Sequence, residues 1–124
     1  MNNHLLFVYG SLKKGEIFHE GYLGTAQFLG KYKTKGALLD IGNFPGFVRI
    51  GDGYVYGELY SITTNDLMSI DMLEAEGFMY RRVKVPLTNV ASTELAEAFA
   101  YELMSPGVYR TAKRLKDGVW SKGS

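Results

Sequence analysis

The sequence contains no cysteine. It therefore carries no disulfide, no thiol nucleophile and no thiolate metal site, and its core depends on packing alone. A chain without cysteine fits a reducing compartment, so we expect a cytoplasmic protein. Histidine is scarce as well, because His4 and His19 are the only two. Two histidines without a carboxylate cluster beside them do not predict a metal site.

Neither sign of charge dominates the chain. Lysine and arginine total 14 against 13 aspartate and glutamate residues, a formal charge of +1, so we expect no nucleic-acid partner. Long apolar runs are missing too. The first one, Leu5–Tyr9, is too short for a signal peptide or a membrane span, and we expect no membrane association. We expect a single domain over residues 1–124, with residues 117–124 as a loose tail.

Glycine is plentiful, with 15 residues that separate short runs rich in Val, Tyr, Phe, Ile and Leu. Such runs predict strands, here over Leu5–Tyr9, Ala26–Tyr32, Gly36–Ile41, Phe47–Ile50, Tyr54–Ile62, Tyr80–Leu87 and Leu95–Met104. Gly57 lies inside one run, where glycine often marks a bulge or a barrel corner. Leu95–Ala100 suits a helix as well as a strand. The pattern favours an α+β domain built on a curved sheet or a small barrel.

The first strand stops abruptly at a Gly-Ser pair. Gly10 permits backbone angles that a side chain forbids, so the amides of Gly10, Ser11 and Leu12 can turn toward a ligand. This turn is therefore a candidate cradle for an anion or an oxyanion. A glycine after a strand is also typical of an ordinary turn, and these residues alone do not separate the two interpretations.

One segment has the pattern of a helix. Thr63 can cap it, Leu67, Ile70 and Glu74 recur on one face, and Gly77 ends it. The pattern thus places a carboxylate on the apolar face, close to the negative end of the helix dipole. Both burial and this dipole favour the protonated form, which makes Glu74 a candidate base. The alternative is a slightly rotated helix with Glu74 in solvent.

Several short motifs follow one another along nearly the whole chain. They are Tyr9-Gly10-Ser11-Leu12-Lys13-Lys14-Gly15 with His19 and Leu23, Phe44-Pro45-Gly46-Phe47-Val48, Val55-Tyr56-Gly57-Glu58-Leu59-Tyr60, Ile70-Asp71-Met72-Leu73-Glu74, Tyr80-Arg81-Arg82-Val83 and Asp117-Gly118-Val119-Trp120. Each motif alone is weak, but the ordered set is specific. In this set the chain resembles the gamma-glutamylcyclotransferase-like proteins, which include the gamma-glutamylamine cyclotransferases and the AIG2-like proteins of plants.

The resemblance implies a small mixed β-barrel with a few short helices and a central cavity. It also implies an enzyme that cyclises the gamma-glutamyl part of a small substrate to 5-oxoproline, without a cofactor, and releases an amine or an amino acid. The catalytic glutamate of the family matches Glu74, as general acid and base. The residues that we expect to bind substrate are Tyr9, Gly10, Ser11, Leu12 and Tyr80.

Other interpretations stay open at this point. The same cavity would also serve a non-catalytic protein that binds a small molecule, and a chain with nine tyrosines could instead use an aromatic surface to bind a partner. Arg81 and Arg82 could bind a substrate carboxylate, although neighbouring strand residues point to opposite faces, so at most one enters the cavity. The leaving group is undetermined: an amino acid, a cross-linked lysine, another amine or the remainder of glutathione.

Two competing motifs fail. Gly10 and Gly15 have the spacing of a P-loop, but Glu16 stands where the phosphate-binding lysine is required. Ser11 lacks the Gly-x-Ser-x-Gly elbow of a serine nucleophile.

Overall fold

The computed structural model describes residues 3–42, 44–76, 79–104 and 111–121. Its helices are α1 (His19–Leu23) and α2 (Thr64–Leu73). Its strands are β1 (Asn3–Val8), β2 (Gln27–Lys35), β3 (Ala37–Asp40), β4 (Pro45–Val48), β5 (Tyr54–Thr63), β6 (Tyr80–Asn89), β7 (Leu95–Leu103) and β8 (Lys113–Arg114). Each segment predicted as a strand is one, with ends that differ by a few residues, and the ambiguous segment after Leu95 is a strand.

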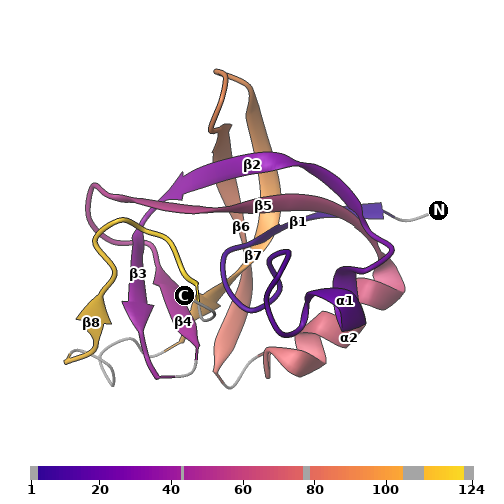
Figure 1. The fold of residues 1–124 in the computed structure, drawn as a ribbon, viewed down its shortest axis with the longest axis horizontal. Coiled ribbons are helices and arrows are strands. Elements are labelled where there is room, and N and C mark those ends of the chain that lie inside the picture. Colours follow the sequence, from indigo (N-terminus) through magenta and orange to yellow (C-terminus); the bar gives the residue numbers. More distant parts are fainter. Residues whose placement is uncertain (1–2, 43, 77–78, 105–110, 122–124) are drawn as a thin grey trace.

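Five of these strands close into a barrel. The order β1-β5-β2-β6-β7 returns to its start because β7 also pairs with β1 in parallel, at Leu6 and Phe99. The other pairings around the ring are antiparallel, so the barrel is mixed, as predicted. The far end of β7 pairs in parallel with β4, which extends the sheet to β3 and β8. Figure 1 shows this extension at one side of the molecule and both helices at the other.

Apolar residues on the two faces of β1 serve two different cores. Phe7 and Tyr9 belong to a cluster that takes side chains from each of the five barrel strands and fills the barrel. Leu6 and Val8 point the opposite way, into a cluster that α1 and α2 cover. Because both faces of β1 are buried from Leu6 to Val8, this part of the strand is continuously apolar and does not alternate. The strand ends at Val8, and Tyr9, the next residue, belongs to the cluster that fills the barrel.

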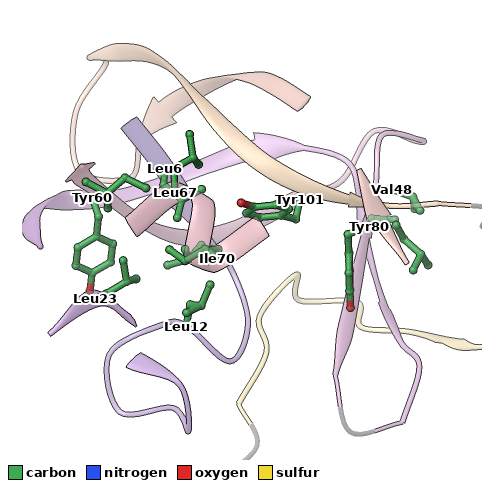
Figure 2. Close-up of a cluster of buried hydrophobic side chains, with 13 residues drawn as sticks. Leu6, Leu12, Leu23, Val48, Tyr60, Leu67, Ile70, Tyr80 and Tyr101 are labelled. Atoms are coloured by element: carbon green, nitrogen blue, oxygen red, sulfur yellow. The ribbon is translucent and has the colours of Figure 1, made fainter. Parts of the chain in front are cut away.

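The helix α2 begins and is oriented as its sequence predicts. The Thr63 hydroxyl accepts a hydrogen bond from the Asp66 N–H at 3.1 Å, and the Asp66 carboxylate accepts one from the Thr63 N–H at 3.4 Å. Leu67 and Ile70 are buried in the cluster beneath the helices, which also contains Leu12 (Figure 2). The predicted end at Gly77 lies outside the described residues. No helix within the described ranges is long and apolar enough to cross a membrane.

Gly57 does not mark the predicted bulge. The register shift of this sheet lies in β2, between Phe28 and Gly30. Gly57 instead lies where β1 and β5 approach closely, since a Cβ there would be 2.2 Å from the Val8 carbonyl oxygen.

The segment after Asp117 differs from the loose tail that the sequence suggested. Trp120 is buried among the residues that fill the barrel, and its carbonyl accepts a hydrogen bond of 2.6 Å from Lys13 Nζ. The Gly118 carbonyl accepts another from the Tyr56 N–H. A single large aromatic side chain thus anchors residues 117–121 to the barrel, whereas residues 122–124 lie outside the described ranges.

Candidate active site

The loop after β1 is held in place by hydrogen bonds to its carbonyl groups. The Gly10 and Ser11 carbonyls accept from the Lys13 and Phe18 N–H groups, both at 3.0 Å. The Leu12 carbonyl lies 2.9 Å from His19 Nδ1, which must carry the proton because a carbonyl only accepts. None of these bonds uses the N–H groups of Gly10, Ser11 or Leu12. The predicted cradle therefore has a fixed backbone.

Gly10 is required for a different reason from the one predicted. Its φ does not lie in the left-handed region, so no special backbone angle demands a glycine. Lack of space demands a glycine, because a Cβ on Gly10 would lie 2.7 Å from Cγ and 3.1 Å from Cδ of Pro45. Proline has a rigid ring and no flexible side-chain end that could move aside. The close approach of β4 to this loop, which local sequence does not reveal, accounts for the residue.

All six residues predicted for the site line one cavity. These are Tyr9, Gly10, Ser11, Leu12, Glu74 and Tyr80. We call it the inner cavity. The loop after β1 supplies one wall, the end of α2 supplies Glu74, and the start of β6 supplies Tyr80. Segments that lie far apart in sequence thus meet at one place, next to the helices in Figure 1.

The two tyrosines predicted for the site use their hydroxyl groups to hold the cavity wall. The Tyr9 hydroxyl donates to the Tyr101 carbonyl at 2.6 Å and accepts from the Phe47 N–H at 3.3 Å. The Tyr80 hydroxyl donates to the Pro45 carbonyl at 2.8 Å. Tyr9 therefore lines the cavity without bonding to Glu74. Burial, together with the nearby Tyr80 and Glu74, holds the pKa of Tyr9 well above its usual value, so this hydroxyl stays neutral.

Glu74 occupies the C-cap position of α2 and is partly buried. Its N–H still donates to the Ile70 carbonyl at 2.9 Å, and the chain then turns sharply at Ala75, where φ is +50°. Burial raises the pKa of Glu74 from 4.5 to about 7, because no described side chain offsets the lost hydration of its carboxylate. A carboxyl group with this pKa takes and returns a proton readily near neutral pH.

A second acidic residue, Asp71, lies one turn earlier in α2, and its carboxylate already has partners within the protein. The Asp71 carboxylate pairs with Arg82 and accepts a hydrogen bond of 2.5 Å from the Tyr101 hydroxyl. Tyr101 lines the inner cavity beside Glu74. Asp71 and Arg82 therefore hold Tyr101 in place, and both charges of this pair are compensated within the protein.

A second hollow adjoins the inner cavity and shares four residues with it, Ser11, Phe44, Glu74 and Tyr80. We call it the outer hollow. Its other walls are Phe18, Leu73 and Met79. Glu74 thus stands at the boundary between the two spaces.

Sequence reasoning missed part of the lining. Phe44 and Pro45 carried the family resemblance, but nothing local showed that they reach the loop after β1. Tyr101 was missed because its position depends on the pairing of β7 with β6. The two arginines considered for a substrate carboxylate line neither space: Arg81 pairs with Glu102 and Arg82 with Asp71.

Comparison with known proteins places this geometry in a family. The model of the gamma-glutamyl cyclotransferase, AIG2-like family matches residues 6–122. A Vibrio cholerae protein provisionally named a gamma-glutamylcyclotransferase is 44% identical over 81 residues, 64% of this chain and 69% of that protein. The gamma-L-glutamyl-butirosin B gamma-glutamyl cyclotransferase of Niallia circulans is 33% identical over 105 residues, 77% of this chain and 65% of that protein.

Solved structures agree on the fold. The crystal structure of an AIG2-like protein from Mus musculus superposes with a TM-score of 0.85 over 100% of this chain and 92% of that protein, at 23% identity. The family model covers nearly all of the chain, including the loop after β1, Glu74 and Tyr80. The chain belongs to the gamma-glutamyl cyclotransferase, AIG2-like family.

Proposed function

We propose that this protein is a gamma-glutamyl cyclotransferase that releases 5-oxoproline and an amine or an amino acid from a gamma-glutamyl compound, with Glu74 as general acid and base. Family membership supports cyclotransferase activity in general terms. The observation that carries the assignment of the base is Glu74 itself, a carboxyl group with a pKa of about 7 in the wall of a cavity. A cavity that only bound its ligand would have no use for such a group.

The gamma-glutamyl part of the substrate occupies the inner cavity in this proposal. Its gamma-carbonyl oxygen faces the N–H groups of Gly10, Ser11 and Leu12, the donors that the hydrogen bonds of the loop leave unused. These fixed dipoles stabilise the negative charge that develops on the oxygen during attack, and they need no rearrangement to do so.

The reaction then requires one proton to move twice. The neutral alpha-amino nitrogen of the substrate attacks its own gamma-carbonyl carbon and gives a proton to the Glu74 carboxylate. The new carbon–nitrogen bond closes the five-membered ring. Glu74 returns the proton to the departing nitrogen as the old amide bond breaks, which leaves 5-oxoproline and a free amine. Atoms and charges balance without a cofactor.

Little further machinery is needed because the attack is intramolecular. The nucleophile and the electrophile belong to one molecule, so the protein has mainly to fold the substrate into a near-ring. The aromatic wall of Tyr9, Tyr80 and Tyr101 restricts the shapes that fit. The hydroxyl groups of Tyr9 and Tyr80 donate to backbone carbonyls, and that of Tyr101 donates to the Asp71 carboxylate. These hydrogen bonds keep the wall rigid.

A screen of gamma-glutamyl compounds for release of 5-oxoproline tests this proposal. We expect turnover by the wild-type protein and a fall of roughly a hundredfold or more in kcat for Glu74→Gln, which keeps the shape of the side chain but takes up no proton. Calorimetry should show that Glu74→Gln still binds the intact substrate. Equal activity of the two proteins would remove Glu74 from the mechanism. Tight binding without turnover by either would indicate a non-catalytic binding protein.

A further inference from the structure

A hollow of about 600 Å³ lies beside α1, away from the space around Glu74. We call it the side hollow. Its walls come from the loop after β1, from α1 and from the neighbouring strands β2 and β5, and no described residue lines both it and the inner cavity. Figure 2 shows Tyr60 and Leu23, which line it, at the opposite end of the cluster beneath the helices from Tyr80. A hollow of this volume accommodates a small organic molecule.

Three rings form one wall of the side hollow. The centroid of the Tyr60 ring lies 5.5 Å from that of Phe28 and 5.6 Å from that of His19. Tyr60 and His19 are buried, whereas Phe28 is 52% exposed. An exposed phenyl ring on a fixed aromatic base offers a face on which an aromatic group of a ligand can stack.

The charged side chains that line the side hollow balance one another. Lys14 and Lys31 supply two positive charges, and Glu20 and Glu58 supply two negative ones. Neither lysine forms an ion pair with a described residue. Their ammonium groups can therefore give charge-assisted hydrogen bonds to a carboxylate on a ligand.

Glu58 and His19 supply acceptors in the same hollow. The Glu58 Oε1 atom accepts from the Lys14 N–H and from the Tyr60 hydroxyl, both at 2.9 Å, which fixes the carboxylate and leaves Oε2 outside these two bonds. His19 is 7% exposed and donates through Nδ1 to the Leu12 carbonyl, so in the neutral ring Nε2 carries a lone pair. No described residue is hydrogen-bonded to that Nε2. These acceptors suit a ligand that brings an ammonium group.

We propose that the side hollow is a second binding site, for a free alpha-amino acid with an aromatic side chain. The ammonium group of the ligand donates to Glu58 and to Nε2 of His19. Its carboxylate accepts from Lys14 and Lys31, and its ring stacks on Phe28. A ligand with one of the two charges alone would leave either the cations or the acceptors without a partner, because the charges of the lining balance. This site adds to the proposed cyclotransferase activity and does not depend on it.

Four small compounds test which groups of the ligand the hollow recognises. L-phenylalanine carries all three, phenethylamine lacks the carboxylate, 3-phenylpropionate lacks the ammonium group, and L-alanine lacks the ring. Amide chemical shifts of the wild-type protein, followed by NMR during titration, give the Kd of each compound and show where it binds. We expect L-phenylalanine to shift the amides around the side hollow, and the Kd of each other compound to be at least roughly tenfold higher.

Variants then assign the binding to the side hollow. Lys31→Gln and Phe28→Ser remove a cation and the exposed ring, and each should raise the Kd of L-phenylalanine several-fold. Both side chains are exposed, so we expect these variants to fold. Lys35→Gln is the matched control, because Lys35 is exposed in the same strand and does not line the hollow. Glu74→Gln should bind L-phenylalanine as the wild type does, since Glu74 belongs to the other cavity.

The outcomes separate this proposal from the proposed function. The second site is overturned if L-phenylalanine shifts no amide around the side hollow, or if phenethylamine or 3-phenylpropionate binds as tightly. It also fails if Lys31→Gln and Phe28→Ser bind L-phenylalanine as the Lys35→Gln control does. A higher Kd for Glu74→Gln would place the amino acid in the inner cavity and contradict the proposal. None of these measurements needs turnover, so a failure to release 5-oxoproline from any gamma-glutamyl compound would count against the cyclotransferase alone.

Discussion

Two glutamates in this molecule are at least partly buried, but their pKa values shift in opposite directions. Glu102 in β7 is 7% exposed and accepts hydrogen bonds from Arg49 at 2.8 and 2.9 Å and from Arg81 at 3.2 Å. Burial by itself raises its pKa, but the bonds from these two arginines outweigh burial and hold the pKa of Glu102 below its usual value. Glu74 has burial without such partners, and its pKa rises to about 7.

The difference shows what makes a buried carboxyl group useful for chemistry. A carboxylate that two guanidinium groups enclose is a stable anion, and it joins β7 to the end of β4 and to β6. A carboxyl group that faces a cavity without a cation keeps its affinity for a proton. The same side chain is thus structural in β7 and a candidate base at the end of α2.

The largest expected effect is on turnover, and it separates the two glutamates directly. Glu74→Gln should lower kcat by roughly a hundredfold or more, whereas Glu102→Gln should leave kcat within about threefold of wild type. Both substitutions remove one negative charge and keep the side-chain shape, so each is the control for the other. Release of 5-oxoproline by the purified variants gives both numbers. A larger loss for Glu102→Gln would reverse the assignment of their roles.

The cradle beside Glu74, which has no counterpart at Glu102, predicts an effect on binding. Gly10→Ala places a Cβ against Pro45 and should weaken substrate binding by roughly tenfold or more, since the close approach of loop and β4 shapes the cavity. Gly15→Ala is the matched control, because Gly15 has φ +89° but a Cβ added there would meet no atom within 4 Å. It should cost about 1 kcal/mol of stability and leave binding unchanged. Calorimetry with an intact gamma-glutamyl ligand distinguishes the two, and equal affinities would argue against the cradle.

The smallest effect concerns stability, and the two glutamates should differ in its sign. The raised pKa of Glu74 means that the folded protein holds this proton more tightly than the unfolded chain, so wild-type stability is lost as pH rises from about 4.5 through about 7. Glu74→Gln escapes that loss and should be more stable than wild type at pH 8, by between about 1 and 3 kcal/mol. The gain should vanish below about pH 4.5.

Glu102→Gln should have the opposite effect. The lowered pKa of Glu102 contributes stability that is present at neutral pH and is lost as pH falls through the folded-state pKa. Removal of this charge leaves Arg49 and Arg81 without their partner, at an expected cost on the order of 1 to 2 kcal/mol at pH 8 after screening of the exposed arginines. Urea denaturation of the three proteins at pH 4 and pH 8 measures both effects. A Glu74→Gln variant less stable than wild type at pH 8 would contradict the burial of an uncompensated carboxylate.

Local sequence predicted the elements that local interactions determine. The capping residues Thr63 and Asp66 and the spacing of Leu67 and Ile70 place α2, and that placement brings Glu74 to the inner cavity. The short helix α1 was not predicted because its five residues have no capping hydrogen bond from a side chain and are held by burial of His19 and Leu23. Strand ends also differ from prediction, since pairing with neighbours and not propensity decides them.

Contacts between segments that are distant in sequence account for the features that local sequence did not predict. The need for glycine at position 10 comes from Pro45, 35 residues away, and the burial of Trp120 comes from a barrel that closes around it. The partners of Arg81 and Arg82 depend on the register of β6 with β7 and on the helix above them. Alternation along β6 predicts only that these two arginines face opposite ways.

The central claim is that burial without a cation gives Glu74 its basicity, and titration of its carboxyl carbon by NMR tests this most directly. The Glu74→Gln variant identifies the signal, because the Glu74 carboxylate resonance is absent from it. The account predicts a midpoint of about pH 7 for Glu74 in the wild-type protein, while Glu102 titrates below its usual range. A Glu74 midpoint near 4.5 would show a solvated carboxylate and contradict its role as the base.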